Sequence, residues 1–277
     1  MFLKEYGKAK ARALALFGLE PAHNSDPATN GEYAFLRFVR SLPEAAACDA
    51  VIDVGANRGD WTAEAVRVFN GTGISRFFCV EPIPTFSAQL RSRFASNAGV
   101  SVLETALSDS SAGNARIFEI SGGGRMYRNY RSPEPADGNL EEDVTSATGK
   151  KIVSHKVRTS TGDELFSDVS FRPCLLKIDC DGHDGHILHG FKALIGERRP
   201  LIQFEYCDFW IGAQSRLADT CRLLHSADYR TYKLFPDKLT RFKYGPWFET
   251  YGYQNIIAAP AEFSSFAGSS IQIGERR

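Results

Sequence analysis

The sequence lacks both an excess of charge and a long apolar run. Its 277 residues carry 33 Lys plus Arg against 33 Asp plus Glu, so the formal net charge is zero. A neutral chain has no overall field that attracts nucleic acid or an anionic membrane. No uninterrupted apolar stretch approaches the roughly 20 residues of a membrane span. We therefore expect neither a nucleic-acid partner nor a membrane span.

The sequence also lacks a Cys-x-x-C pair. Its six cysteines are scattered, and several lie in apolar strand-like runs such as "RFFCVEP" and "CLLKIDC". This distribution is typical of reduced, buried thiols rather than of a disulfide framework. The basic N-terminal segment has a short apolar run with helical spacing and no small-residue cleavage site, which disfavours a signal peptide. Together these features predict a cytoplasmic protein.

Two catalytic signatures are absent as well. G-x-S-x-G does not occur, and no cysteine lies in a recognisable His-paired motif, so nothing local supports a protein nucleophile. The dinucleotide fingerprint G-x-G-x-x-G is missing, because Gly55 is followed by Ala56, Asn57 and Arg58 before Gly59. A nicotinamide-dependent oxidoreductase is therefore an alternative and not the first interpretation.

What the sequence does contain is a regular alternation of strand-like and helical patterns. Helical patterns separate short apolar runs, and parallel strands need such crossovers. We predict an α/β fold with a doubly wound, mostly parallel sheet. The predicted strands are 50–55, 76–82, 100–107, 174–180, 200–207 and 229–235, with an antiparallel strand at 253–259. The predicted helices between them are 61–69, 86–95, 186–195 and 215–227.

Helical spacing at residues 2–17 and 33–42 precedes this alternation. We predict an N-terminal helical extension over residues 1–45 and one domain over residues 46–277.

Residues 121–150 break the alternation. They are rich in Gly, Pro, Ser and charge, and long loops of this kind are often lids or binding loops. We expect a mobile loop here whose Arg125, Tyr127 and Tyr130 contact an acceptor.

A glycine-containing turn follows the first strand of the domain. "VIDVGANRGDW" places Asp53, Gly55, Ala56, Asn57 and Gly59 between a strand and a helix. Glycine permits a tight turn and close approach of a ligand to the backbone, and the start of a helix offers unpaired N–H groups.

Glu81 ends the next predicted strand, 22 residues after Gly59. A carboxylate there accepts hydrogen bonds from ribose hydroxyls, because ligands of open α/β sheets bind at the carboxyl ends of the strands. The alternative is a solvated loop carboxylate. Combined with the glycine turn, Glu81 indicates a nucleoside ligand.

Carboxylates and imidazoles crowd the stretch "KIDCDGHDGHILHGF" at residues 177–191. Its three histidines are three positions apart, so on a helix they drift by about 60° per step and do not converge on a metal. A calcium loop fails because Gly is missing at its sixth position and Glu at its twelfth. A Mg²⁺ ion held by one or two carboxylates and waters remains an open alternative.

The sequence resembles the FkbM family of S-adenosylmethionine-dependent methyltransferases. The resemblance rests on "VIDVGANRGDWT", "VEPIPTFSAQL", "ETALSDSSAGNA", "TSTGDEL", "LLKIDCDGHDGHILHGF" and "PLIQFE", in the family's order, over about residues 50–206. It implies a Rossmann-like class I methyltransferase fold. The family usually has Glu where Asp181 and Asp184 stand and a β-branched residue at Cys180, so contacts of these groups are expected to shift.

The resemblance also implies positions for the cofactor. The glycine-turn residues Asp53, Gly55, Asn57 and Gly59 would border the methionine part, and Glu81 would bind the ribose. The adenine would lie between Ala106, Leu107 and Ser108. Asn30 or Glu32 is a candidate cover for the methionine end, although Asn30 could equally cap a helix.

We expect an O-methyltransferase in which the acceptor oxygen attacks the methyl group directly. The enzyme then needs alignment and a base for the hydroxyl proton. The candidates are Asp179, Asp181 and His183, with Asp179 also near the cofactor, and Glu205 on the acceptor side. His186 and His189 are expected to be bystanders, and Asp184 a helix N-terminal charge.

Non-catalytic roles are also open for Asp179. Asp179 could simply pair with Lys177 or cap the following helix.

The family resemblance implies a hydroxyl acceptor on a sugar or natural product. A non-catalytic nucleoside-binding module of the same fold is the remaining alternative.

Overall fold

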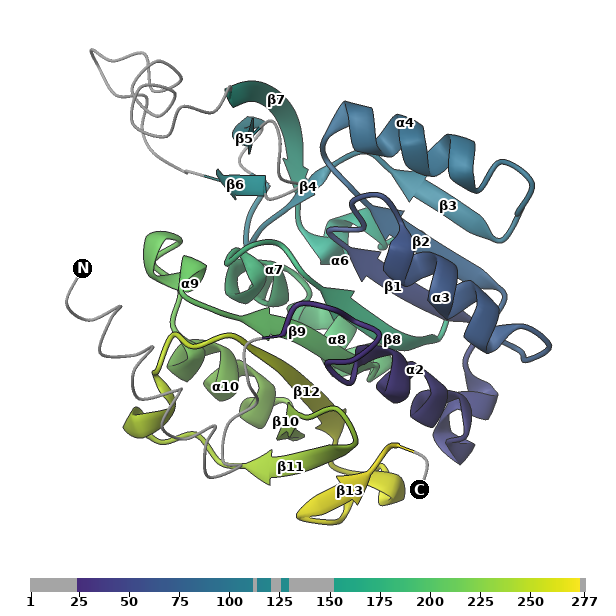
Figure 1. The fold of residues 1–277 in the computed structure, drawn as a ribbon, viewed down its shortest axis with the longest axis vertical. Helices are drawn as coiled ribbons and strands as arrows, with labels where there is room; N and C mark the ends of the chain where they lie inside the picture. Colours follow the sequence, from purple (N-terminus) through teal and green to yellow (C-terminus); the bar gives the residue numbers. More distant parts are fainter. Residues whose placement is uncertain (1–23, 112–113, 121–125, 130–151, 275–277) are drawn as a thin grey trace.

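The structure is a computed structural model that describes residues 24–111, 114–120, 126–129 and 152–274. Figure 1 shows a large sheet that crosses the molecule, with a smaller sheet above it. The large sheet contains β1 (Ala50–Val54), β2 (Arg76–Val80), β3 (Val100–Leu103), β8 (Pro173–Ile178), β9 (Leu201–Tyr206), β10 (Tyr229–Leu234), β11 (Lys238–Phe242), β12 (Gln254–Pro260) and β13 (Ser270–Gln272). The small sheet contains β4 (Ala106–Leu107), β5 (Asn114–Ile120), β6 (Met126–Asn129) and β7 (Ile152–Ser160).

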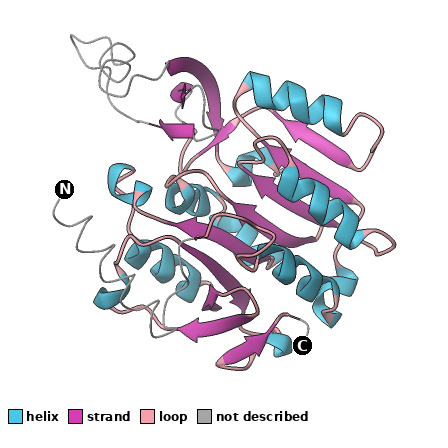
Figure 2. Cartoon of the chain, in the orientation of Figure 1, coloured by secondary structure: helices cyan, strands magenta, loops and turns pink. Residues whose placement is uncertain are grey.

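Figure 2 shows helices on both sides of the large sheet. They are α2 (Glu32–Arg40), α3 (Asp60–Phe69), α4 (Pro84–Arg93), α6 (Gly162–Leu165), α7 (Asp184–Gly190), α8 (Lys192–Arg198), α9 (Phe209–Gly212) and α10 (Leu217–Ser226). The described residues also contain three short 3-10 helices, namely η1 (Pro43–Ala47), η2 (Pro246–Phe248) and η3 (Ser264–Phe266).

The large sheet has the order β13-β11-β10-β12-β9-β8-β1-β2-β3. From β3 to β9 every neighbouring pair is parallel. β12 is antiparallel to both β9 and β10, so β10 again runs in the direction of β1. These pairings confirm the predicted α/β class with a mostly parallel sheet, and β12 is the antiparallel strand expected at 253–259.

Two apolar layers cover the two faces of this sheet. Helices α2 and α3 bury Phe35, Leu36 and Trp61 against one face, which includes Val51 and Leu175. The other face packs against helices α7, α8 and α10. Because helices cover both faces, β1 and β8 are buried along their whole length, as their continuous apolar runs indicate. The doubly wound arrangement is thereby confirmed.

The predicted strand 100–107 is wrong as a single element. Thr105 N donates to Leu103 O at 3.1 Å, and this turn separates β3 in the large sheet from β4 in the small one. The predicted helix 186–195 is likewise divided into α7 and α8 at Phe191, whose ring is fully buried.

The small sheet was not predicted and has the order β4-β7-β5-β6. Its long pairing is antiparallel, from Asn114 opposite Arg158 to Ile120 opposite Ile152. Residues 126–129, expected within a loop, form β6 instead and pair with β5. The rest of the expected loop at 121–150 lies outside the described residues.

The N-terminal region is described from residue 24 onward, so the helix expected at 2–17 lies outside the described residues. Helix α2 corresponds to the helix expected at 33–42. The boundary between residues 45 and 46 stays a prediction.

Candidate functional site

The turn between β1 and α3 lies against the carboxyl end of β8. Gly55 has a φ of 80°, and a Cβ atom at this position would come within 2.0 Å of Asp179 O. Only glycine therefore allows the two strand ends to approach so closely. Asn57, in the same turn, has a φ of 50°, a conformation that costs energy in a residue with a side chain.

Glu81 joins this turn to the end of β2. Its side chain is fully buried, and its two carboxylate oxygens accept hydrogen bonds from Asn57 N and Ile83 N, both at 2.9 Å. A carboxylate offers about four lone pairs, so both oxygens can accept further donors. The structure thus places Glu81 beside the glycine turn, where a ribose-binding carboxylate was expected.

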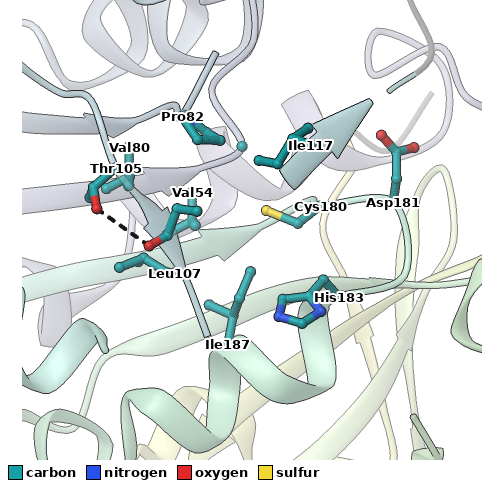
Figure 3. Close-up of a pocket in the computed structure, with 12 residues that line it drawn as sticks. Val54, Val80, Pro82, Thr105, Leu107, Ile117, Cys180, Asp181, His183 and Ile187 are labelled. Atoms are coloured by element: carbon teal, nitrogen blue, oxygen red, sulfur yellow. Dashed lines mark hydrogen bonds between the residues drawn. The ribbon is translucent and has the colours of Figure 1, made fainter. Parts of the chain in front are cut away.

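An apolar pocket opens on the side of the sheet that faces α7. We use this name for the space lined by Val54, Gly55, Val80, Pro82, Thr105, Ala106, Leu107, Ile117, Cys180, Asp181, His183 and Ile187. Figure 3 shows Leu107, Ile187 and Val54 around it, with the Cys180 thiol and the His183 ring at one side. Two of the expected adenine-side residues, Ala106 and Leu107, therefore face a common space.

Ser108, the third residue expected beside the adenine, does not line the pocket itself but contacts the pocket residue His183. Ser108 Oγ and His183 Nε2 are 3.0 Å apart, and His183 is 9% exposed. This places His183 with the residues expected at the adenine.

His186, expected to be a bystander in catalysis, has several contacts within the fold. Its Nδ1 lies 3.0 Å from Asp109 Oδ2, its Nε2 lies 2.9 Å from Ala213 O, and its ring stacks on His183 with centroids 4.8 Å apart. His186 therefore joins α7 to the segment after β4 and to the end of α9. His189 lies on the exposed side of α7.

A polar region occupies the opposite side of the same strand ends. We use this name for Glu32, Asp53, Lys177, Asp179, Gln203, Glu205 and Asn255. Asp53 pairs in register with Lys177, Lys177 with Gln203, and Glu205 with Asn255. Because side chains alternate along a strand, Asp179 follows Lys177 on the same face and Glu205 follows Gln203. Four neighbouring strands thus direct polar groups to one side.

Lys177 is the cation of the polar region. Its Nζ lies 3.1 Å from Asp179 Oδ2 and 3.5 Å from Asp53 Oδ1, and its side chain is 5% exposed. Burial acts to lower the pKa of Lys177, but the carboxylates of Asp179, Asp53 and Glu32 outweigh it, and the pKa is raised well above its usual range. The pairing of Asp179 with Lys177 that we considered from the sequence is present.

Glu32, at the start of α2, is held by three amide groups. Its carboxylate accepts hydrogen bonds from Asn30 Nδ2 at 2.7 Å, Gln203 Nε2 at 2.8 Å and Asn255 Nδ2 at 3.2 Å. Asn30 Oδ1 also accepts from Glu32 N at 2.9 Å, so Asn30 supports the helix start as a capping residue would. Burial raises the pKa of Glu32.

Glu205, which is partly exposed, and Asp184, which is fully buried, add two carboxyls beside Asp179. Asp184 begins α7, yet it is fully buried and accepts hydrogen bonds from Gly182 N and Glu205 N, at 3.1 and 3.3 Å. Asp184 thus lies in the first turn of α7, where a helix N-terminal charge was expected, and it also fastens the β8–α7 loop to β9. Burial raises the pKa of both carboxyls well above the usual range, with Asp179 as the next cause.

Asp181 lies in that β8–α7 loop, between Asp179 and the pocket. It has a φ of 47°, and Gly182 after it has a φ of 98°. A Cβ atom on Gly182 would come within 2.5 Å of the Phe209 backbone, so glycine is needed there. The loop thus carries Asp181 to the pocket while Asp179 remains in the polar region.

Some buried polar atoms in and near the polar region have no partner in the described part of the chain. Gln203 Oε1 and Trp61 Nε1 are two of them. We predicted a role for neither residue from the sequence, nor for Asn255. "PLIQFE" and "YQNIIAA" do contain a polar residue within an apolar strand, and this is the signal that could have found Gln203 and Asn255.

The remaining expectations are settled only in part. Arg125 lies outside the described residues, and Tyr127 lies in β6, where only the backbone is described. Among the described residues, no three or more His, Cys, Asp or Glu side chains are arranged to hold a metal ion. No helix in the described ranges is long and apolar enough to cross a membrane.

Comparisons with known proteins identify the family. The methyltransferase FkbM from Methylobacillus flagellatus KT is 14% identical, with a TM-score of 0.46, and the alignment covers 79% of this chain but 47% of that one. The O-methyltransferase from Bacillus cereus, solved in complex with SAH, is 14% identical, with a TM-score of 0.43 and coverage of 92% and 90%. No curated protein matches the chain.

The chain thus spans about half the length of the first of these structures. The family is shown by the model described as the methyltransferase FkbM domain, which matches residues 53–231, more than half of the 277 residues. The chain belongs to the FkbM methyltransferase family.

Proposed function

We propose that the chain is an S-adenosylmethionine-dependent O-methyltransferase whose acceptor is a hydroxyl of a sugar or another natural-product scaffold. Membership of the family supports methyl transfer. The observation that carries the proposal is that an apolar pocket and a carboxylate-rich polar region meet at the carboxyl ends of β1 and β8. The acceptor class rests on the family resemblance.

The chemistry of the two regions fits this cofactor. The apolar pocket, with Ala106, Leu107 and the Ser108–His183 pair, suits a purine ring, and Glu81 suits the ribose hydroxyls. The polar region holds four carboxyls against Lys177 alone, so a positively charged ligand would relieve their repulsion.

The amino-acid part of the cofactor would lie at the glycine turn and the polar region. The turn residues are Asp53, Gly55, Ala56, Asn57 and Gly59. The buried Gln203 Oε1, without a partner in the described part of the chain, would accept a hydrogen bond from an ammonium group.

Bound S-adenosylmethionine supplies an electrophilic methyl group. Asp179 is the proposed base for the acceptor hydroxyl, because its side chain is 45% exposed while Lys177 holds it at the end of β8. Asp181 would orient the acceptor. His183 remains a candidate base, although it faces the pocket and not the polar region. Glu205, beside Asp179, would contact the acceptor, together with Arg125 and Tyr127.

A Mg²⁺ ion held by one or two carboxylates and waters stays an open alternative, and no step of the proposal depends on it. A cytoplasmic location, a small-molecule acceptor and the absence of a nucleic-acid partner stay predictions.

Ligand binding tests the proposal directly. We expect S-adenosylhomocysteine to raise the melting temperature of the protein and NADH to leave it unchanged. Stabilisation by NADH instead would favour an oxidoreductase, and no response to either would favour a module without this cofactor. A product assay with labelled S-adenosylmethionine and a panel of glycosides then tests methyl transfer, and labelled amines in place of ethers would contradict O-methylation.

A further inference from the structure

Two cysteines lie together at the amino ends of β1 and β8, the sheet edge opposite the proposed site. Asp49 N donates to Arg172 O at 3.0 Å, and Arg172 N donates to Asp49 Oδ1 at 2.7 Å. These bonds hold the segment that contains Cys48 against the segment that leads into Cys174.

An irregularity in β8 brings the two thiols to the same side. Ala50 pairs with Pro173 and Val51 with Leu175, so Cys174 is an extra residue without a partner on β1. Cys174 is buried in the apolar cluster beneath α2 and α3, and Cys48 packs against that same cluster. Cys48 Sγ donates a hydrogen bond to Glu44 O at 3.6 Å, and it also contacts the Cys174 thiol.

The two thiols differ in exposure and acidity. Cys48 is partly exposed, whereas Cys174 is buried. The contact with the Cys174 thiol lowers the pKa of Cys48, and the nearby Arg172 acts in the same direction against the effect of burial. The pKa of Cys174 is raised well above its usual range by the same contact and by burial. A thiol of lowered pKa beside a second thiol within reach is the arrangement found in reversible thiol oxidation.

We propose that Cys48 is a site of oxidation by hydroperoxides such as hydrogen peroxide, and that Cys174 is its resolving thiol. The Cys48 thiolate attacks the peroxide, so that an S–O bond forms, the O–O bond breaks, and the departing hydroxide takes a proton to give water. The Cys174 sulfur then attacks the Cys48 sulfenic acid. An S–S bond forms, the S–O bond breaks, and the Cys174 proton leaves in a second water molecule. A dithiol reductant reverses the process.

The other four cysteines serve as internal controls. Burial raises the pKa of each, to about 12 for Cys79 and for Cys221 and in the same direction for Cys180 and Cys207. We expect Cys48 to react with iodoacetamide at least about tenfold faster than Cys221 in the native protein.

Peptide mapping of the full chain tests the proposal without a substitution. Trypsin yields residues 41–58 and 159–177, each with a single cysteine, because the Arg172–Pro173 bond resists cleavage. After treatment with hydrogen peroxide we expect these two peptides to be joined, and dithiothreitol to separate them. Joined peptides that contain other cysteines, or an unmodified peptide 41–58, would overturn the proposal.

Two variants separate the roles of the thiols. In Cys174→Ser, dimedone should trap a sulfenic acid at Cys48. In Cys48→Ser, no dimedone adduct should form at Cys174. The opposite labelling pattern would overturn the assignment of roles. Because the pair lies far from the strand ends of the proposed site, the oxidised wild-type protein should bind S-adenosylhomocysteine within twofold of the reduced protein. If neither the reduced nor the oxidised protein binds S-adenosylhomocysteine, the proposed function is contradicted and the thiol chemistry is unaffected.

Discussion

The apolar pocket and the polar region are built by adjacent residues of the same strands. On β1, Asp53 faces the polar region and Val54 lines the pocket. On β8, Lys177 faces the polar region while Ile178 packs in the opposite apolar layer. The period of two along a strand therefore sorts charged and apolar groups to opposite sides. A single ligand that has an apolar base at one end and charges at the other matches this division.

The largest expected effect is a loss of turnover. It should distinguish the role of Asp179 in the polar region from that of His183 in the apolar pocket. Asp179→Asn keeps the shape of the side chain but removes the base, so turnover should fall about 10²- to 10⁴-fold while S-adenosylhomocysteine still binds. His183→Ala should instead weaken the affinity for S-adenosylhomocysteine, because His183 lines the pocket. His189→Ala is the control and should change neither quantity by more than about twofold. If His183→Ala lowers turnover without affecting affinity, His183 is the base.

The second effect is on stability, and it compares two neighbours on β8. Lys177→Met leaves Asp53, Asp179 and Glu32 without their cation, and loss of one partner of a buried ion pair costs about 3–5 kcal/mol. Ile178→Val removes one methylene from the apolar layer and should cost about 0.5–1.5 kcal/mol. Urea unfolding measures both free energies. A smaller loss for Lys177→Met would mean that its charge is not needed for the fold.

The third effect is on ligand affinity, and it distinguishes the residue proposed to bind the ribose from the residue proposed to bind the amino-acid end. Glu81→Ala removes a charged acceptor and should weaken binding of both S-adenosylhomocysteine and 5′-methylthioadenosine, since both carry the ribose. Hydrogen bonds to charged groups contribute roughly 1.5–3 kcal/mol, which is about a 10- to 150-fold loss of affinity. Gln203→Leu should weaken only S-adenosylhomocysteine, because methylthioadenosine lacks the amino acid. Calorimetry that shows equal losses for both ligands would remove Gln203 from the amino-acid end.

The smallest effect is the pH dependence of stability that comes from Glu205. Because burial raises the pKa of Glu205 in the folded protein, the folded state binds its proton more tightly than the unfolded state does. Stability is therefore lost as the pH rises from the usual carboxyl range toward the raised pKa. Glu205→Gln should flatten this decline, which unfolding experiments between pH 4.5 and about 8 would measure. Glu32 and Asp184 also have raised pKa values, so part of the slope should persist, and an unchanged slope would exclude Glu205 as a contributor.

The sequence predicted those features that depend on neighbours along the chain. β1, β2, β8 and β9 lie within one or two residues of their apolar runs, and Glu81 follows its strand as expected. The glycine turn was also found, since Gly55 and Gly59 both have positive φ values. Local period and turn chemistry are sufficient for such elements.

What the sequence did not predict depends on contacts between distant segments. Glu32 lies 171 positions from Gln203 and 223 from Asn255, and no local pattern indicates that these side chains meet. The burial of Asp184 likewise requires β9 to lie beside α7. The alternation in "IVSHKVRTS" of β7 is a local signal that was overlooked.

The place of β12 in the sheet has a consequence for the order of assembly during synthesis. β12 lies between β9 and β10, although β10 and β11 leave the ribosome before it. The outer strands therefore cannot join the growing sheet until residues 254–260 have emerged and inserted beside β9. The residues that line the apolar pocket are all synthesised by Ile187, whereas the polar region awaits Asn255. A nascent chain halted between these two points would present the apolar pocket while the polar region beside it is still incomplete.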